Sequence, residues 1–554
     1  MSGGLPIKKH TIKDLVHSYI DFDDRERRLI DSPWCQRLKR VRQNDVSSAV
    51  YPSMHGTRFE HSLGAMHLAG LCMQSALESS DDGAVKTFLD CLAIETGSQA
   101  GGPAIEELAI SLGRLYGLLH DIGHPPFSHL MESCLDFDAI YGSERVASAP
   151  DKWLKKWHEF NGREIVQEHL TTEPLTAFVA RMMGIEVGNL ALRAIKSLID
   201  AVIDADRMDF VLRDGLTSGG EFGHYGQERL VKSFRIYLDR APNQSIREIF
   251  IRPSSDALSA IESLLQERYK IYRWVHFHHR VVMATAFFRY ALGRARDLGR
   301  IDGRCFRAAN HYAPKGTLPE PPPDEPSQNS PYTLLGDSYV ESKLEELLGE
   351  LERGDLEMEY VAGQRLRAAL RALLLRERWA VPLWKRLDDY REFGSRLRDE
   401  LNEQIKTRSL VHEDPLYVLG RYAMESPGGR KFLNEVQHKL NADTGEGWYL
   451  VECTAGFKVK GDDKIVAQKS GVLHQLSGRA RDGRTAIGLS AVVPALEEAW
   501  RQDIFLYAFR VADELGEVDD ETWVRIGRKR LASALASVYA ELRDDIDPFQ
   551  ESLA

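Results

Sequence analysis

LLHDIGHPPFSHLMES, residues 118–133, carries the strongest structural signal in this chain. An apolar helix is expected to end here, because Gly123 and two prolines interrupt the helical pattern. The stretch concentrates three histidines and an aspartate between His120 and His129. Histidine and aspartate together suit a divalent transition metal. Neighbouring helical side chains point about 100° apart, so His120 and Asp121 are expected to share one ion only near such a helix end or through opposite lone pairs.

Two distant segments supply residues of the same chemical kind. His61 lies in RFEHS, at the predicted start of a helix. LIDAVIDADRMDFVLRD, residues 198–214, places Asp206 and Asp209 three positions apart on one face of an otherwise apolar helix. Burying carboxylates without partners is costly. A bound metal or an arginine network is therefore expected around these aspartates.

The composition argues against several classes of protein. The 554 residues are 43% hydrophobic and 28% charged, as in a folded globular protein with one large domain and additions, or with two to three domains. The net charge of −11 argues against nucleic acid as the main partner. The six cysteines form no CxxC pair, which argues against a zinc ribbon or a disulfide framework. Without a signal-like segment or a long apolar run, a cytoplasmic protein with no membrane partner is expected.

Apolar residues at three- and four-residue spacings predict a mostly α fold. The predicted helices cover residues 58–77, 105–120, 160–169, 192–214, 257–298, 342–352, 357–379 and much of the 380s and 390s. A segment rich in serine, glycine and aspartate, residues 79–102, is expected to be an inserted loop.

Changes of pattern divide the chain into four predicted regions. Residues 1–300 form a helical core, and the prolines around 311–333 predict a loop or linker over 301–340. A helical extension is expected over 341–446. Beyond it, WYLVECTAGFKV, DKIVAQ and IFLYAFRV read as strands, which predicts a smaller α+β C-terminal lobe over 447–554.

Three motifs, RFEHS, HDIGHPPFSH and DADRMDFVLRD, follow one another along the chain. Together they resemble the motifs of HD-domain phosphohydrolases, and more narrowly those of the deoxynucleoside triphosphate triphosphohydrolases. The resemblance extends from about residue 12 to about residue 291 and is faint beyond residue 300. It implies an HD-domain helical phosphohydrolase core.

The resemblance also implies a metal centre. The residues that match the family's four ligands are His61, His120, Asp121 and Asp206. They would hold a divalent ion such as Mn, Fe, Zn or Co, and Mg would accompany the nucleotide as a second ion.

Four further residues match the family's catalytic positions. His129 corresponds to the histidine that acts as general acid on the leaving oxygen. Glu132 stands where the family usually has an aspartate that orients this histidine. His124 resembles a phosphate-contacting histidine, and His158 resembles another active-site histidine.

Substrate contacts carry over from the same resemblance. Arg58, Arg207 and Arg268 match phosphate-binding positions, which suits the charge of a triphosphate. Gln43 and Asp214 match residues that hold the sugar 3′-hydroxyl.

Departures from the family pattern cluster at the expected sugar site. Asn44 stands where relatives have a leucine, and both Phe210 and His276 stand where relatives have tyrosines. Hydrogen-bonding groups at Asn44 and His276 weaken the expectation of strict selectivity for deoxyribose, because strong discrimination needs a clash or an unpaired polar group.

The family resemblance implies metal-dependent hydrolysis of deoxynucleoside triphosphates. In the family, water attacks the α-phosphorus and releases a deoxynucleoside and inorganic triphosphate. The resemblance further implies a nucleotide allosteric effector, a homo-oligomer (dimer, tetramer or hexamer), and a role in dNTP-pool control or antiviral defence. Two alternatives stay open: a phosphohydrolase acting on ribonucleotides, modified nucleotides or a nucleotide signal, and a nucleotide-sensing regulator with little turnover.

Overall fold

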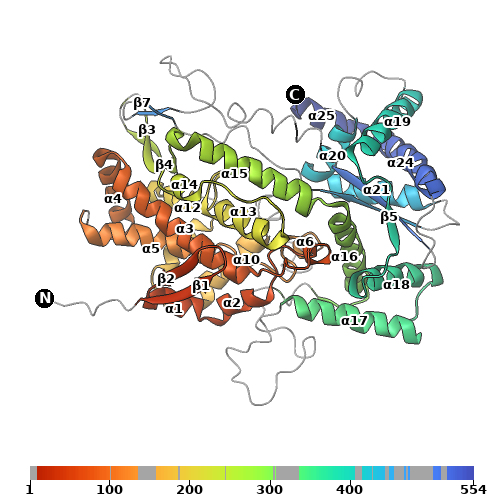
Figure 1. Ribbon diagram of the computed structural model, residues 1–554, viewed down its shortest axis with the longest axis horizontal. Helices are drawn as coiled ribbons and strands as arrows, with labels where there is room; N and C mark the ends of the chain where they lie inside the picture. The colour runs from red at the N-terminus through yellow and green to blue at the C-terminus, as the bar shows by residue number, and fades with distance from the viewer. Residues whose placement is uncertain are drawn as a thin grey trace. The chain divides into compact units, whose positions relative to one another are not determined.

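The chain is mostly helical, as expected, in a computed structural model (Figure 1). The residues it describes are 9–99, 101–134, 157–184, 187–241, 243, 245–302, 306, 336–405, 415–426, 428–442, 448–454, 467–469, 472–474, 499, 503, 505–512 and 521–553. The proline-rich segment predicted around 311–333 lies outside these residues.

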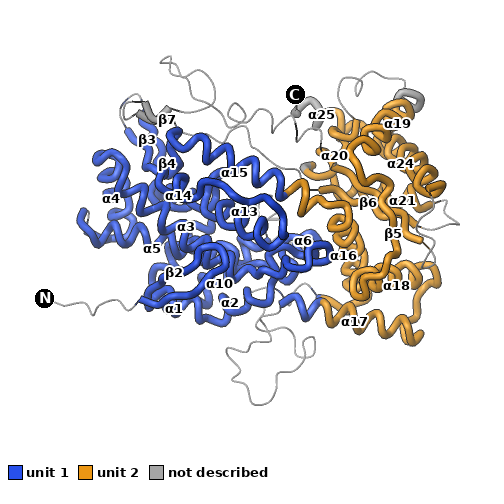
Figure 2. Tube along the Cα trace, viewed as in Figure 1, with its two compact units in different colours: residues 1–271, 302–340, 459–494 blue, residues 272–301, 341–458, 495–554 orange. Residues whose placement is uncertain are grey.

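Two compact units make up the chain (Figure 2). The first contains residues 1–271, 302–340 and 459–494, and the second contains residues 272–301, 341–458 and 495–554. The first unit thus ends earlier than the core predicted over 1–300, and the second takes in most of the two regions predicted after residue 340.

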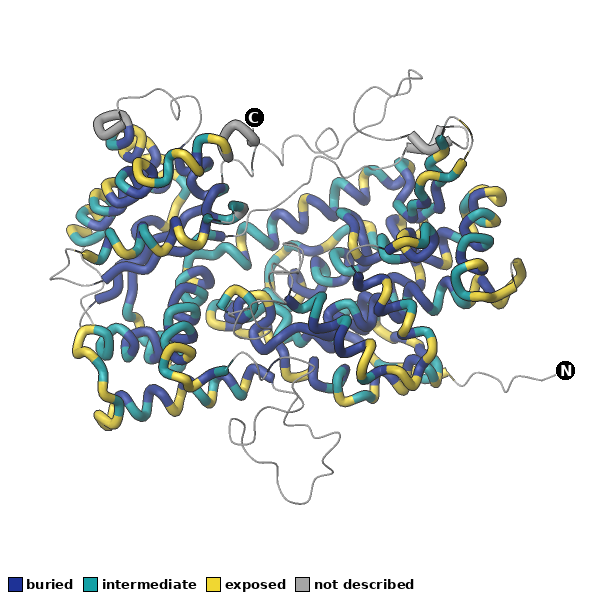
Figure 3. The backbone as a smooth tube through the Cα atoms, turned by 180° about the vertical axis from the view of Figure 1, so that it is seen from behind, coloured by how far each residue is buried: buried dark blue, intermediate teal, exposed yellow. Residues whose placement is uncertain are grey.

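Three helices form the centre of the first unit. Helix α3 (Arg58–Ser79) packs against α5 (Pro103–Leu119) and α13 (Ala205–Ser218), and it is buried along most of its length (Figure 3). A capping box between Thr57 and Glu60 satisfies the first backbone N–H groups of α3. Gly117 allows the close approach of α5, because a Cβ there would lie 2.7 Å from the Ala65 carbonyl oxygen of α3.

Shorter elements surround this centre. The helices are α1 (Asp24–Ile30), α2 (Pro33–Arg37), α4 (Asp82–Thr96), α6 (Ser128–Glu132), α10 (Trp157–His169), α11 (Thr176–Met182), α12 (Leu190–Lys196), α14 (Gln227–Val231) and α15 (Leu258–Ile271), with single turns at Leu38–Arg40, Ser47–Ala49 and Ser255–Ala257. Three antiparallel hairpins pair β1 (His10–Asp14) with β2 (Ser18–Phe22), β3 (Phe234–Arg240) with β4 (Ile246–Pro253), and β7 (Ala467–Lys469) with β8 (Val472–His474).

The prediction of an inserted loop over 79–102 is wrong, because α4 occupies most of this segment. Its polar residues are helix caps. The Asp81 side chain accepts hydrogen bonds from the first turn, and Gly97 ends the helix in the left-handed conformation at φ 66°. Between the caps, Phe88 and Leu92 are four positions apart and fully buried.

Two segments predicted as single long helices are broken. The Asp204 side chain caps the start of α13, so residues 192–214 form two helices, α12 and α13. Residues 257–298 contain α15, a π-helical turn over Tyr272–His276, and α16.

The second unit combines helices with a three-stranded sheet. Its helices are α16 (His279–Asp297), α17 (Asp337–Arg353, the first turn of which belongs to the first unit), α18 (Tyr360–Leu374), α19 (Leu387–Ile405), α20 (Pro415–Glu425), α21 (Gly429–Asn441), α24 (Glu521–Glu541) and α25 (Arg543–Leu553). Strand β9 (Leu506–Val511) is central and entirely buried, between β5 (Ala380–Pro382) and β6 (Trp448–Cys453).

The sheet confirms the smaller α+β lobe and corrects one detail. Residues 380–382 were expected to be helical but form β5, which pairs antiparallel with β9 in the register Ala380 to Val511. This pairing is a long-range contact, which local helical spacing does not report. Within the described residues, no helix has both the length and the apolar character needed to cross a bilayer.

Candidate metal centre and histidine cluster

The four residues predicted as metal ligands come from three helices of the first unit. His61 lies in the first turn of α3, and Asp206 lies in the first turn of α13. His120 caps the C-terminus of α5 and is followed by the turn that carries Asp121. His61 Nε2 lies 3.1 Å from Asp206 Oδ1 and 3.6 Å from Asp121 Oδ2. His120 Nε2 lies 3.4 Å from Asp121 Oδ1. We call these four residues the HD cluster.

The hydrogen bonds of the two imidazoles fit a metal. His61 Nδ1 donates to Asp209 Oδ2 at 2.8 Å, and His120 Nδ1 donates to the Gly117 carbonyl oxygen at 2.8 Å. With the proton on Nδ1, the neutral ring presents the lone pair of Nε2. Both Nε2 atoms are buried, and among the described residues neither has a partner in hydrogen-bond geometry. The ligand atoms of His61, His120 and Asp121 lie within 4.8 Å of one another, which fits a bound cation.

Burial and charge shape the protonation of the HD cluster. Burial raises the pKa of Asp121, but the charges of Arg58 and His120 hold it well below its usual range. Burial lowers the pKa of His61, but the neighbouring carboxylates of Asp206 and Asp209 raise it to about 10, so a cation bound at Nε2 would replace the proton that the ring otherwise holds there. The carboxylates are therefore ionised, and the pocket favours a cation.

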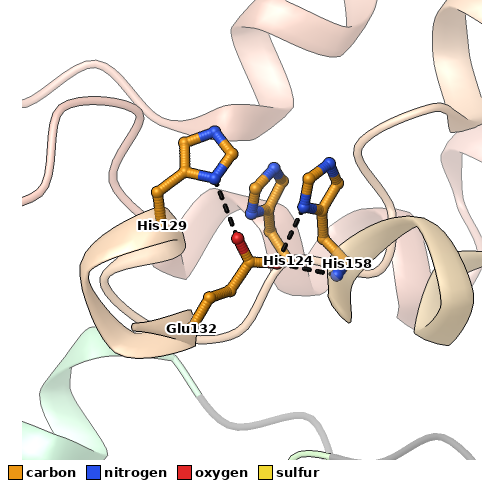
Figure 4. A group of neighbouring side chains, drawn as sticks. All are labelled: His124, His129, Glu132 and His158. Carbon is orange, nitrogen blue, oxygen red and sulfur yellow. Dashed lines mark hydrogen bonds and ion pairs between the residues drawn. The ribbon is translucent and has the colours of Figure 1, made fainter. Parts of the chain in front are cut away.

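A second group, which we call the histidine cluster, contains His124, His129, Glu132 and His158 (Figure 4). Glu132 of α6 bridges two imidazoles: Oε2 lies 2.8 Å from His129 Nδ1, and Oε1 lies 2.7 Å from His158 Nδ1. The same Oε1 accepts the His158 backbone N–H at 2.7 Å. The rings of His124 and His158 stack at 4.0 Å with an interplanar angle of 9°.

The histidine cluster contains groups with different proton affinities. Burial raises the pKa of Glu132, but the charge of His158 and the hydrogen bond of His129 hold it well below its usual range. Burial lowers the pKa of His158, but Glu132 raises it overall. Burial and the charges of Arg58 and His158 lower the pKa of His124 well below its usual range. His129 is the accessible member, with 64% of its side chain exposed.

The two clusters are adjacent where the loop at Gly123 packs against helix α10. His124 Nε2 lies 3.3 Å from Asp121 Oδ1 of the HD cluster. Gly123 lies between these two residues, and a Cβ there would come within 2.0 Å of the His158 carbonyl oxygen of α10. Gly123 therefore allows α10 to bring His158 against His124.

The close approach at Gly123 predicts a loss of stability in Gly123→Ala. Because the obstructing atoms are backbone atoms, we expect a fall of about 3 kcal/mol in the free energy of unfolding, measured by chemical denaturation. Gly293→Ala, in helix α16 with open space around its Cβ, is the control and should change stability by less than about 1 kcal/mol. An unchanged denaturation midpoint for Gly123→Ala would contradict the described packing.

Asp337 also positions the site, although the sequence analysis did not identify it. Its Oδ1 accepts the Phe127 backbone N–H at 2.8 Å, and its Oδ2 accepts the Arg42 backbone N–H at 3.1 Å. Phe127 and Ser128 have positive φ values, 53° and 46°, which are costly for residues other than glycine. Asp337 thus helps to hold a strained loop that leads into His129. The pairing spans 210 positions, and no local signal in the sequence predicts it.

The residues predicted to bind phosphate are paired with carboxylates or buried. Arg58 contacts Asp121 through Nη1, and its Nε donates to Ser128 Oγ at 2.8 Å. Arg207 pairs with Asp204 one turn earlier, and Arg268 is buried on α15. Arg58 thus lies directly beside the HD cluster.

The residues predicted to bind the sugar divide between the units. Asn44 Nδ2 donates to Asp214 Oδ1 at 2.6 Å. The Gln43 backbone N–H donates to the Gly56 carbonyl oxygen, and Phe210 is half-buried on α13. His276 belongs to the second unit, where its ring meets Tyr272 at 5.3 Å, and its predicted role stays a prediction.

A family model places this geometry among known proteins. Residues 58–210 match the model described as the HD domain, and this range contains both clusters. This stretch of the chain is therefore an HD domain. Two solved structures have the same overall fold: a hypothetical protein from Aquifex aeolicus (TM-score 0.53, 19% identity, covering 95% of this chain and all of that one) and a phosphohydrolase from Bacteroides thetaiotaomicron (TM-score 0.52, 17% identity, covering 91% and 100%).

Several curated relatives match parts of this HD-domain chain. The uncharacterized protein MJ1154 of Methanocaldococcus jannaschii is 29% identical over 281 residues, which are 51% of this chain and 49% of the relative. The uncharacterized protein YwfO of Bacillus subtilis is 26% identical over 297 residues, 52% and 57% of the two chains. The human deoxynucleoside triphosphate triphosphohydrolase SAMHD1 is 32% identical over 121 residues, 22% and 16%. The chain spans about half the length of the first two relatives.

Proposed function

We propose that this HD-domain protein hydrolyses deoxynucleoside triphosphates to a deoxynucleoside and inorganic triphosphate, with a metal bound in the HD cluster. The observation that carries the proposal is the joint placement of the two clusters. Two buried Nε2 atoms and the carboxylates of Asp121 and Asp206 lie close together, and beside them are three imidazoles, two of which Glu132 bridges. The human relative named as a triphosphohydrolase supports the choice of substrate.

The metal and the arginines would prepare the phosphate. A bound divalent ion supplies an activated water and withdraws charge from a phosphoryl oxygen. Arg58, which contacts Asp121 of the HD cluster and Ser128, would neutralise part of the charge of the triphosphate. Arg207 and Arg268 would add to this charge, as at their matching family positions.

His129 would protonate the departing oxygen. It is the exposed imidazole of the histidine cluster, so a substrate can reach it. Glu132 accepts from His129 Nδ1 and thereby presents Nε2 outward with a fixed ring orientation. A positioned general acid of this kind accelerates proton transfer in the transition state.

Product identification tests the proposed reaction. The purified protein is incubated with each dNTP and each NTP, singly and in mixtures, and the products are separated by chromatography. We expect deoxynucleoside and triphosphate. Turnover only in mixtures would indicate activation by a second nucleotide, which is part of the proposal. The proposal also includes a homo-oligomeric enzyme located in the cytoplasm. A nucleoside monophosphate with pyrophosphate would contradict the reaction.

One contact favours ribonucleotides as a second candidate substrate. Asn44 donates to Asp214, so a polar amide lies where family members carry a leucine. An amide oxygen at this place would accept a hydrogen bond from a 2′-hydroxyl, whereas a leucine would exclude it.

Asn44→Leu should therefore raise selectivity for deoxyribose. We expect the ratio of kcat/KM for dGTP to that for GTP to increase by about tenfold, because one polar contact is worth about 1.4 kcal/mol. Steady-state assays with both nucleotides measure this ratio, and Asn44→Asp, which keeps a polar group, is the control. An unchanged ratio in Asn44→Leu would exclude Asn44 as a determinant of sugar selectivity.

A further inference from the structure

The N-terminal hairpin reaches a buried aspartate behind the HD cluster. The turn between β1 and β2 carries His17, whose Nε2 donates to Asp209 Oδ1 at 2.7 Å. The other oxygen of Asp209 accepts from Nδ1 of His61 at 2.8 Å. One carboxylate thus connects the hairpin to a predicted metal ligand 44 positions away from His17.

Arg213 fixes the orientation of this carboxylate. Its Nη2 lies 2.9 Å from Asp209 Oδ1, and its Nε lies 3.0 Å from Asp209 Oδ2. This two-point contact defines the plane of the carboxylate as well as its position. Arg213 lies one turn after Asp209 on α13, so both partners share one helix face.

The hairpin turn also holds the arginine. Arg213 Nη1 donates to Asp14 Oδ2 at 3.0 Å, and Asp14 Oδ1 accepts the backbone N–H groups of Val16 and His17, both at 2.9 Å. The side chains of Asp14, His17, Asp209 and Arg213 are each no more than 3% exposed. We call these four residues the hairpin relay.

A glycine makes room for the hairpin relay. Gly64 faces it from α3, and a Cβ there would lie 1.8 Å from Asp209 Oδ1 and 2.8 Å from Arg213 Nη2. Both oxygens of Asp209 are engaged in hydrogen bonds, so the carboxylate cannot turn away from a side chain at position 64 without breaking one of them.

We propose that the hairpin relay positions His61 for metal binding, with His17 as a positioning residue that acts through Asp209. The inference rests on the proposed metal site. A carboxylate that accepts from the far nitrogen of a ligating imidazole fixes its tautomer and raises its basicity, and losing such support lowers metal affinity about 10–100-fold. A merely structural role predicts lower stability with unchanged metal affinity.

The affinity of the metal-free protein for manganese(II), measured by equilibrium dialysis, tests this role. We expect His17→Ala to weaken binding about 10–100-fold. His10→Ala is the matched control, because His10 lies on the same hairpin and pairs with Asp24 at 2.7 Å rather than with Asp209. It should bind manganese as the wild type does, and thermal unfolding of the metal-free variants measures their stability separately from their metal affinity.

Conservative variants separate positioning from folding. In His17→Gln the side-chain amide can donate at the position of Nε2, so affinity should return close to the wild-type value. In His17→Asn the amide falls short, so affinity should stay low. The positioning role of His17 would be contradicted if His17→Ala bound manganese as tightly as the wild type, or if His10→Ala weakened manganese binding as much as His17→Ala does. Equal binding by wild type and Asp206→Ala would instead show that the proposed metal site is wrong.

Discussion

Asp206→Ala should abolish triphosphate release. The variant removes one of the four predicted ligands, the carboxylate that lies 3.1 Å from His61 Nε2, and the remaining three would hold a divalent ion poorly. A metal contributes several kcal/mol to transition-state stabilisation, so we expect a fall of about 10³-fold or more in kcat/KM. Phosphate-product chromatography on purified protein measures the loss, and folding is checked by circular dichroism.

Asp200→Ala is the matched control for this experiment. Asp200 precedes Asp206 in the same segment, but it pairs with Lys196 at 2.6 Å and with the Tyr116 hydroxyl at 3.1 Å. Its removal should leave most of the activity. Triphosphate release by Asp206→Ala at the wild-type rate would exclude the HD cluster as the catalytic metal centre.

His129→Ala should lower kcat while KM changes little. A general acid acts in the transition state and contributes little to ground-state binding, so we expect a loss of about 10²–10⁴-fold in kcat. The proposed triphosphate contact at Arg58 and the predicted metal ligands are untouched by the change. Steady-state kinetics with a single dNTP measure both constants.

His169→Ala controls for the loss of an imidazole from this region. His169 lies at the end of α10, where its ring stacks on Trp34 at 5.0 Å, and it takes no part in the histidine cluster. Its kcat should stay near the wild-type value. A His129→Ala variant that turns over as fast as His169→Ala would rule out the general-acid role.

Three local motifs, together with the family that they resemble, predicted the four residues of the HD cluster, which lie close together in the fold. His120 and Asp121 were expected to share an ion at a helix end supplied by Gly123, and α5 does end beside this pair, although at Leu119 rather than at Gly123. For the aspartates of α13, either a bound metal or an arginine network was expected. Asp206 faces His61 at the predicted metal site, whereas Asp209 belongs to a network with Arg213. The residue types and their spacing carried this information.

Long-range contacts were not predictable in the same way. The strained loop is held by two such contacts: Asp337 accepts the Phe127 backbone N–H, and Ser128 Oγ donates to the Arg42 carbonyl oxygen. Strand β5 likewise depends on its pairing with the distant strand β9. In α4, the serines, glycines and aspartates of the caps were taken for a loop, because caps and loops use the same residues. These features depend on tertiary pairing or on helix ends, which hydrophobic periodicity does not encode.

Metal content is the most direct test of the central claim. Elemental analysis of the purified wild-type protein, after removal of loosely bound ions, should give about one transition-metal ion per chain, since the HD cluster offers one set of four ligands. The same measurement on Asp206→Ala should give far less. A wild-type protein that retains no ion after reconstitution, or an Asp206→Ala variant that retains as much as the wild type, would contradict the account.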